Sequence, residues 1–128
     1  MDYKTFINDL IRNFPEIKEE ILDEGYTGNI TLQIGCFKRF TQKAIDSYNF
    51  NTIKKCFQFV DLNIDRVEFE IENSLVITYL GDLDFSMNLK AENLLSEKLK
   101  HIIYELRKYY LSPIKNEKLR KFLDQFLT

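Results

Sequence analysis

The chain has 128 residues, of which 45% are hydrophobic and 30% are charged, and its formal net charge is −2. These values predict a single domain over residues 1–128 with a buried core, and they exclude a disordered chain. No run of about 18 uncharged apolar residues occurs, so we expect no membrane span. Residues 1–4 lack the features of a signal sequence, which predicts a cytoplasmic location.

Apolar residues recur at helical spacing near the N-terminus and predict a helix over residues 2–13. Pro15 ends this helix and suits the first turn of a second one, because its missing N–H costs nothing there. A turn is expected between Gly25 and Gly28. The apolar side of the second helix consists of Ile17, Ile21 and Leu22.

Residues 30–48 carry two overlapping patterns. Their first apolar residues alternate as in a strand, but a spacing of three and four continues for five turns, which favours a helix. Gly35 weakens either interpretation. Asn51 is a plausible N-cap for the next helix, which ends near Asn63.

Residues 66–80 also admit two structures. Strict alternation followed by a turn at Asn73-Ser74 is typical of a β-hairpin, and the fold would then be α+β. An isolated hairpin is marginally stable, and two local pairs favour a helix instead. These pairs are Asp65 with Glu68, which resembles a capping box, and Arg66 with Glu70, which lie one helical turn apart. We predict a helix.

Residues 81–86 form a predicted loop, and the clearest helical stripe then extends from Ala91 to Leu111. Ser112-Pro113 ends it, and a short amphipathic helix is predicted over residues 116–127. Six or seven helices with short links indicate an all-α fold of stacked helical hairpins.

Residues with catalytic potential are few. His101 is the single histidine and lies within a regular helical pattern, which favours a structural or surface role. Cys36 and Cys56 lie in apolar patterns and are predicted to be small buried hydrophobic residues in a reducing compartment. No metal-ligand spacing, nucleophile motif or phosphate-binding glycine loop occurs. We therefore predict no enzymatic activity, no metal and no cofactor.

The C-terminal third is rich in basic residues that are candidates for phosphate contacts. They are Lys98, Lys100, Arg107, Lys108, Lys115, Lys118, Arg120 and Lys121. The isoelectric point of the whole chain is about 5.5, unlike the basic profile of most nucleic-acid-binding domains. We expect no direct nucleic-acid binding.

The middle of the chain resembles a family of small helical bacterial proteins associated with polymorphic-toxin and contact-dependent inhibition loci. The likeness rests mainly on residues 54–60, Val67, residues 73–80 and Asp84-Phe85, and it covers residues 1–111. Where an acid is expected after Tyr79-Leu80, this chain has Gly81. The resemblance implies a HEAT-like α-solenoid and an immunity protein that silences a cognate toxin by tight binding.

An immunity role requires a rigid surface of complementary charge and no catalytic group. Acidic patches would suit a basic toxin such as a nuclease. We expect the toxin contact at four acidic residues with exposed aromatic residues nearby: Glu68, Glu72, Asp82 and Asp84. The alternative is a helical-repeat adaptor that binds other proteins without enzymatic activity. The oligomeric state stays open.

Overall fold

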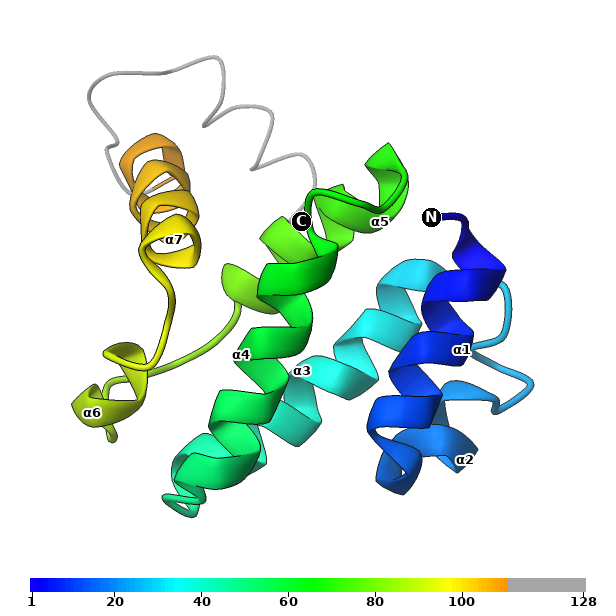
Figure 1. Ribbon diagram of the computed structural model, residues 1–128, viewed down its shortest axis with the longest axis horizontal. Helices are drawn as coiled ribbons and strands as arrows, with labels where there is room; N and C mark the ends of the chain where they lie inside the picture. Colours follow the sequence, from blue (N-terminus) through cyan, green and yellow to red (C-terminus); the bar gives the residue numbers. More distant parts are fainter. Residues whose placement is uncertain (111–128) are drawn as a thin grey trace.

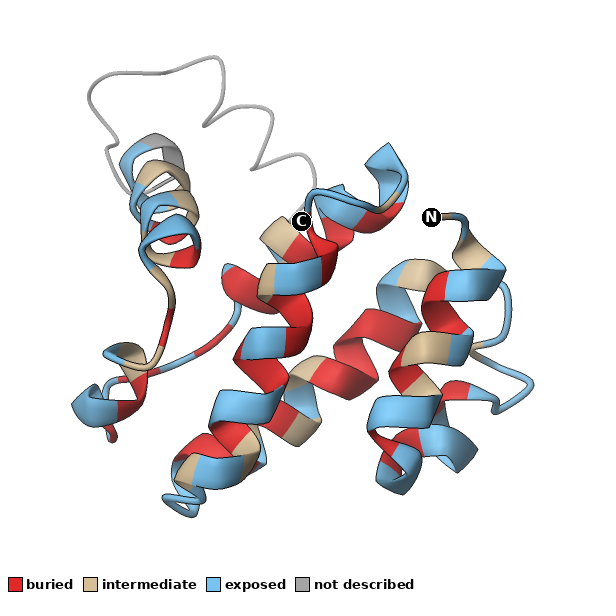
Figure 2. Cartoon of the chain, in the orientation of Figure 1, coloured by how far each residue is buried: buried red, intermediate tan, exposed pale blue. Residues whose placement is uncertain are grey.

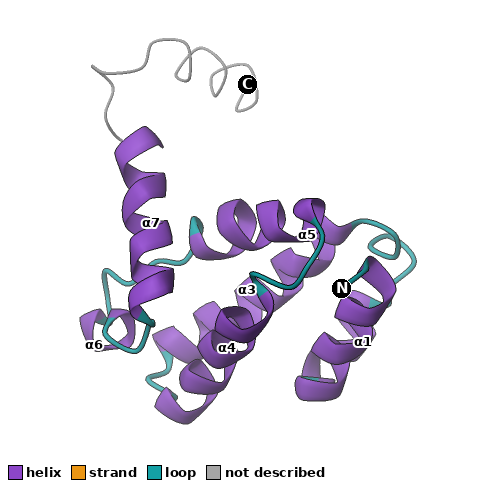
Figure 3. Cartoon of the chain, turned by 45° about the horizontal axis from the view of Figure 1, so that its top comes forward, coloured by secondary structure: helices purple, strands orange, loops and turns teal. Residues whose placement is uncertain are grey.

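The computed structural model describes residues 1–110, and within this range every regular element is a helix (Figures 1 and 3). The elements are α1 (Tyr3–Asn13), η1 (Pro15–Ile17), α2 (Lys18–Ile21), α3 (Ile30–Asp46), α4 (Phe50–Asn63), α5 (Phe69–Ser74), η2 (Leu75–Leu80), α6 (Leu89–Glu92) and α7 (Glu97–Tyr110). The predicted all-α fold is confirmed, and the β-hairpin alternative at residues 66–80 is excluded.

The longest helix, α3, lies at the centre of the molecule. It contacts η1 and α2 on one side and α4, α5 and η2 on the other. Asn29 caps α3 by accepting a hydrogen bond from the backbone N–H of Leu32. A short link joins α3 to α4, and the two form a helical hairpin (Figure 1).

The predicted N-cap of α4 is wrong by two residues. The side chain of Asn49, not Asn51, accepts a hydrogen bond from the backbone N–H of Thr52. Tyr48 adopts a positive φ of 57° and reverses the chain, so α4 begins directly after Asn49. Asn51 therefore lies inside the first turn of the helix.

The N-terminal helices agree with the prediction. Asp2 caps α1 through the backbone N–H of Thr5, and Pro15 opens the 3₁₀ helix η1. Ile17 and Ile21 are buried, but Leu22 is 46% exposed because α2 ends after a single turn. The apolar side of this helix thus includes one residue, Leu22, that lies outside the core.

The start of α5 also differs from the expected capping box. The preceding helix α4 extends to Asn63 and the chain then turns, so Asp65 precedes α5 without capping it. Glu68 occupies the N-cap position and makes no side-chain capping bond. Arg66 lies outside the helix that holds Glu70, so the expected pairing along one helix face is wrong.

The predicted helix over residues 91–111 is broken into α6 and α7. Ser96 causes this break, because its hydroxyl accepts the backbone N–H of Leu99 and also binds Asp61 of α4. Asn88 caps the single-turn α6 through the N–H of Ala91. The predicted helix over residues 116–127 lies outside the described residues.

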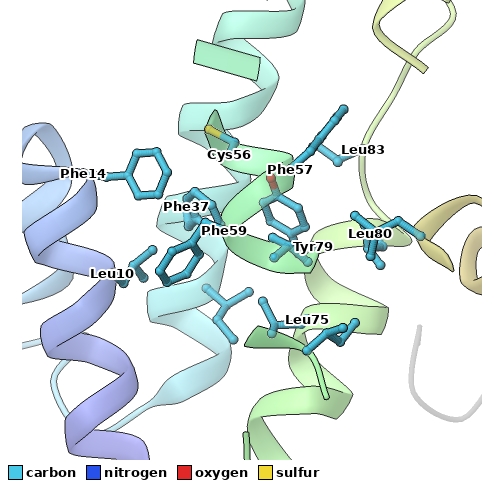
Figure 4. Close-up of a cluster of buried hydrophobic side chains, with 14 of the residues drawn as sticks. Leu10, Phe14, Phe37, Cys56, Phe57, Phe59, Leu75, Tyr79, Leu80 and Leu83 are labelled. Carbon is cyan, nitrogen blue, oxygen red and sulfur yellow. The ribbon is translucent and has the colours of Figure 1, made fainter. Parts of the chain in front are cut away.

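Figure 2 marks the buried residues on the helices around α3, and aromatic rings among them connect these elements (Figure 4). Phe37 of α3 stacks on Tyr79 of η2 with ring centroids 4.7 Å apart. Its other neighbours are Phe14 and Phe59, at 5.0 and 5.7 Å. One core therefore spans α1, α3, α4 and η2, and it holds the loop that follows η2 in a fixed position.

A regular solenoid stays a prediction. The hairpin of α3 and α4 is flanked by the single-turn helices α2 and α6, so residues 1–110 give no series of equal hairpins. Across the same residues, none of the helices has both the length and the apolar composition needed to cross a bilayer.

Candidate protein-binding surface

The four predicted contact acids are all exposed, but they form two separate pairs. Glu68 and Glu72 lie at the start of α5, where the backbone N–H of Glu68 donates to the carbonyl of Met1. Asp82 and Asp84 follow the end of η2. Ten helical residues span about 15 Å, so α5 and η2 hold the two pairs apart.

Asp82 and Asp84 line a shallow depression between α3 and the loop over residues 81–87, with a volume of about 490 Å³. Four further residues, which the sequence did not mark as site residues, complete the lining: Lys38, Gln42, Asp46 and Met87. The three carboxylates outnumber the single ammonium group of Lys38, so this acidic depression carries a net negative charge.

The side-chain amide of Gln42 fixes the loop to α3. Its Oε1 accepts the backbone N–H of Asp84 at 2.8 Å, and its Nε2 donates to the Asp84 carbonyl at 2.9 Å. Nε2 also lies 3.0 Å from Oδ1 of Asp46. Since both backbone groups of Asp84 are bound, the acidic loop is positioned before any partner arrives.

Local hydrogen bonds favour the ionised form of Asp84. Side-chain and backbone hydrogen bonding from Ser86, whose backbone N–H donates to Oδ1 at 2.9 Å, lowers the pKa of Asp84. Asp82 is more weakly engaged, because its Oδ2 lies 3.9 Å from Nζ of Lys38 and its side chain is 65% exposed. Both carboxylates are therefore open to a positively charged partner.

One buried and one exposed hydrogen bond anchor the far end of the loop. Asn88 Nδ2 donates to the carbonyl of Ile45 at 2.8 Å, and the Tyr48 hydroxyl donates to the carbonyl of Met87 at 2.7 Å. Both ends of residues 84–88 are thus bound to the second half of α3 or to Tyr48 just beyond it. This surface is rigid, which reduces the entropy lost on binding.

The residues considered for catalysis lie elsewhere. His101 is exposed on α7, whereas Cys36 and Cys56 are buried and unpaired, as predicted. Burial raises the pKa of each thiol to about 11, so both are protonated at neutral pH. Within residues 1–110, no three His, Cys, Asp or Glu side chains are grouped so that they could bind a metal ion.

The sequence alone located two of the six residues that line this depression. Asp82 and Asp84 stood out as a pair in a loop, but their partners on α3 did not. Lys38, Gln42 and Asp46 are spaced by four residues and so share one helix face, which was the available signal. Nothing in the sequence showed that the loop would pack against that face.

Comparison with known proteins gives a family without an assigned role. No curated protein and no solved structure is significantly similar to the chain. The family described as a domain of unknown function (DUF7674) matches residues 7–116, which is most of the sequence. The chain therefore belongs to the DUF7674 family.

Proposed function

We propose that this protein is an immunity protein that neutralises a cognate bacterial toxin by stoichiometric binding in the cytoplasm. The observation that carries this proposal is the acidic depression, where Gln42 holds Asp84 beside Asp82 and Asp46. A rigid, negatively charged surface is what a binder of a basic protein needs. The resemblance to immunity proteins adds the class of partner.

Neutralisation requires only that the toxin's working surface be covered. A nuclease binds its substrate through a basic groove, and carboxylates that enter this groove exclude the phosphates. Complementary charge also accelerates the encounter of the two proteins. In this proposal Asp82 and Asp84 contact basic groups of the toxin directly, and Glu68 and Glu72 lie outside the main contact.

The test is a charge change at the depression. The double variant Asp82→Lys, Asp84→Asn removes the negative charge, while the amide oxygen introduced at position 84 can still accept the bond from Ser86. We expect at least about tenfold weaker binding to the toxin domain encoded beside this gene, measured by titration calorimetry, with an unchanged melting temperature.

The matched control is Glu68→Lys, Glu72→Gln, which makes the same change in net charge at the other end of α5 and η2. It should alter affinity by less than about threefold, because exposed charges far from an interface act weakly through salt solution. Equal losses in both variants would contradict the assigned surface. No binding of the wild-type protein to that toxin domain would contradict the immunity proposal itself.

A further inference from the structure

Tyr48 occupies a backbone position that normally belongs to glycine. It lies just beyond the end of α3 with a φ of 57°. The backbone N–H groups of Tyr48 and Asn49 donate to the carbonyls of Ile45 and Ala44, which is the Schellman arrangement that ends many helices. A side chain at this left-handed position is unfavourable, so glycine would be the better residue for the fold alone.

The side chain of Tyr48 does not compensate by filling the core. It is 56% exposed, and its ring lies 6.3 Å from that of Phe50 in an edge-to-face contact. Its hydroxyl binds the Met87 carbonyl, which leaves the side chain of Met87 78% exposed. Leu89, two residues later, is 69% exposed. Three large apolar side chains are therefore exposed here: Tyr48 just beyond α3, Met87 bound to it, and Leu89 at the start of α6, next to Asn88, which is bound to Ile45.

This apolar patch of Tyr48, Met87 and Leu89 adjoins the acidic depression. Met87 lines the depression together with Asp46 and Asp84, and Gln42 binds both of these acids. An exposed apolar group beside fixed carboxylates fits a partner that presents an apolar side chain next to lysine or arginine. Such central apolar anchors with a charged rim carry most of the affinity in many protein interfaces.

We propose that Tyr48, Met87 and Leu89 form the apolar anchor of the toxin interface, and that the toxin meets them with an apolar side chain flanked by basic residues. This inference rests on the proposed function and deepens it. In this proposal the Tyr48 side chain offsets its unfavourable backbone in two ways: its hydroxyl holds the loop at Met87, and its exposed ring binds the partner.

Two variants separate binding from folding. Tyr48→Gly removes the ring and relieves the left-handed backbone. Met87→Ser removes the exposed side chain of Met87 but keeps the backbone carbonyl that accepts the bond from Tyr48. Each should weaken binding to the toxin domain by at least about tenfold. Met87→Ser should leave the melting temperature unchanged, and Tyr48→Gly should change it little, because the relieved backbone offsets the lost bond from the Tyr48 hydroxyl to the Met87 carbonyl. Tyr48→Phe keeps the ring and should bind within about threefold of the wild type.

The matched control is Phe69→Ser, because Phe69 is 77% exposed at the start of α5 and lies outside the patch. It should bind like the wild type. Wild-type affinity in Tyr48→Gly and Met87→Ser would overturn the anchor, while a loss in the Asp82→Lys, Asp84→Asn variant would still support the proposed function. A wild-type protein that does not bind the toxin domain would overturn both proposals.

Analytical sedimentation of the purified protein tests whether a second copy of the chain covers the apolar patch instead of the toxin. We expect a monomer at micromolar concentration. A dimer that Met87→Ser dissociates would overturn the inference, because a second copy of the chain would then cover these residues.

Discussion

At the scale of single residues, the buried pair of Thr41 and Tyr79 gives a sharp test of the core. The Thr41 hydroxyl donates to the carbonyl of Phe37 at 3.0 Å, so the Tyr79 hydroxyl, 2.9 Å away, must donate to Thr41. Tyr79 is fully buried, and this burial raises its pKa well above the usual value. The phenol therefore depends on Thr41 for its hydrogen bond.

The two deletions of this bond should differ in cost. Tyr79→Phe leaves Thr41 bound to Phe37 and should lower the free energy of unfolding by about 1 kcal/mol. Thr41→Val leaves the Tyr79 hydroxyl buried without its acceptor and should cost about 2 to 3 kcal/mol. Urea unfolding of both variants measures the difference. A cost for Tyr79→Phe that exceeds that of Thr41→Val would contradict the assigned direction of the bond.

At the scale of elements, Gly81 controls how η2 meets α7. A Cβ at this position would lie 2.7 Å from the carbonyl oxygen of Ile77 and 2.7 Å from a methyl group of Leu106. The first neighbour is backbone and cannot move aside. This close approach leaves no room for a side chain at position 81.

Alanine at two glycines should therefore have opposite effects. Gly81→Ala should lower the free energy of unfolding by about 1 to 3 kcal/mol through overpacking. A Cβ at Gly35, within α3, would lie 3.5 Å from the Arg39 side chain, which is an ordinary contact. Gly35→Ala should therefore raise the free energy of unfolding by about 0.5 to 1 kcal/mol, because alanine favours the helix. Denaturant titration provides the measurement. A neutral Gly81→Ala would show that α7 is not packed closely against η2.

Sequence periodicity predicted the long helices well and the junctions between them poorly. The helices α1, α3 and α4 each repeat an apolar stripe over three or more turns, and such stripes persist whatever the neighbours are. The failures at Asn51 and Asp65 arose because the preceding chain reversal fixes where a helix begins. Ser96 broke a continuous stripe through a tertiary bond to Asp61, which no local pattern reveals.

At the scale of the whole molecule, the candidate surface shows the same limit. Charge and loop position marked Asp82 and Asp84, but the sequence grouped them with Glu68 and Glu72 because all four are acids near one another in the chain. The packing of α5 and η2 across α3 separates the two pairs. The apolar patch was missed because Tyr48 lies at the end of a helical stripe and resembles a core residue.

The acids of the folded protein whose pKa values are shifted form two sets, carboxyl groups that titrate at low pH and thiol and phenol groups that titrate at high pH. Hydrogen bonds lower the pKa values of three carboxyl groups. Thr5 binds Asp2, Arg39 binds Glu20, and Ser86 binds Asp84. Burial raises the pKa values of Cys36 and Cys56 from 9.0 to about 11, and it raises that of Tyr79 well above its usual value. The acidic groups are exposed and weakly coupled to folding, whereas the alkaline groups belong to the core.

These shifts predict a plateau of stability between about pH 5 and pH 9. Below about pH 5, the carboxylates whose pKa values are lowered by folding bind protons more readily in the unfolded chain, so the free energy of unfolding falls gently. Above pH 9 the unfolded thiols ionise first, and Cys56 alone should cost about 2 kcal/mol by pH 11. Urea midpoints measured across this range test the profile. Cys56→Ala should flatten the alkaline limb whatever it does to the plateau, and an equally steep limb in that variant would rule out burial of this thiol as the cause.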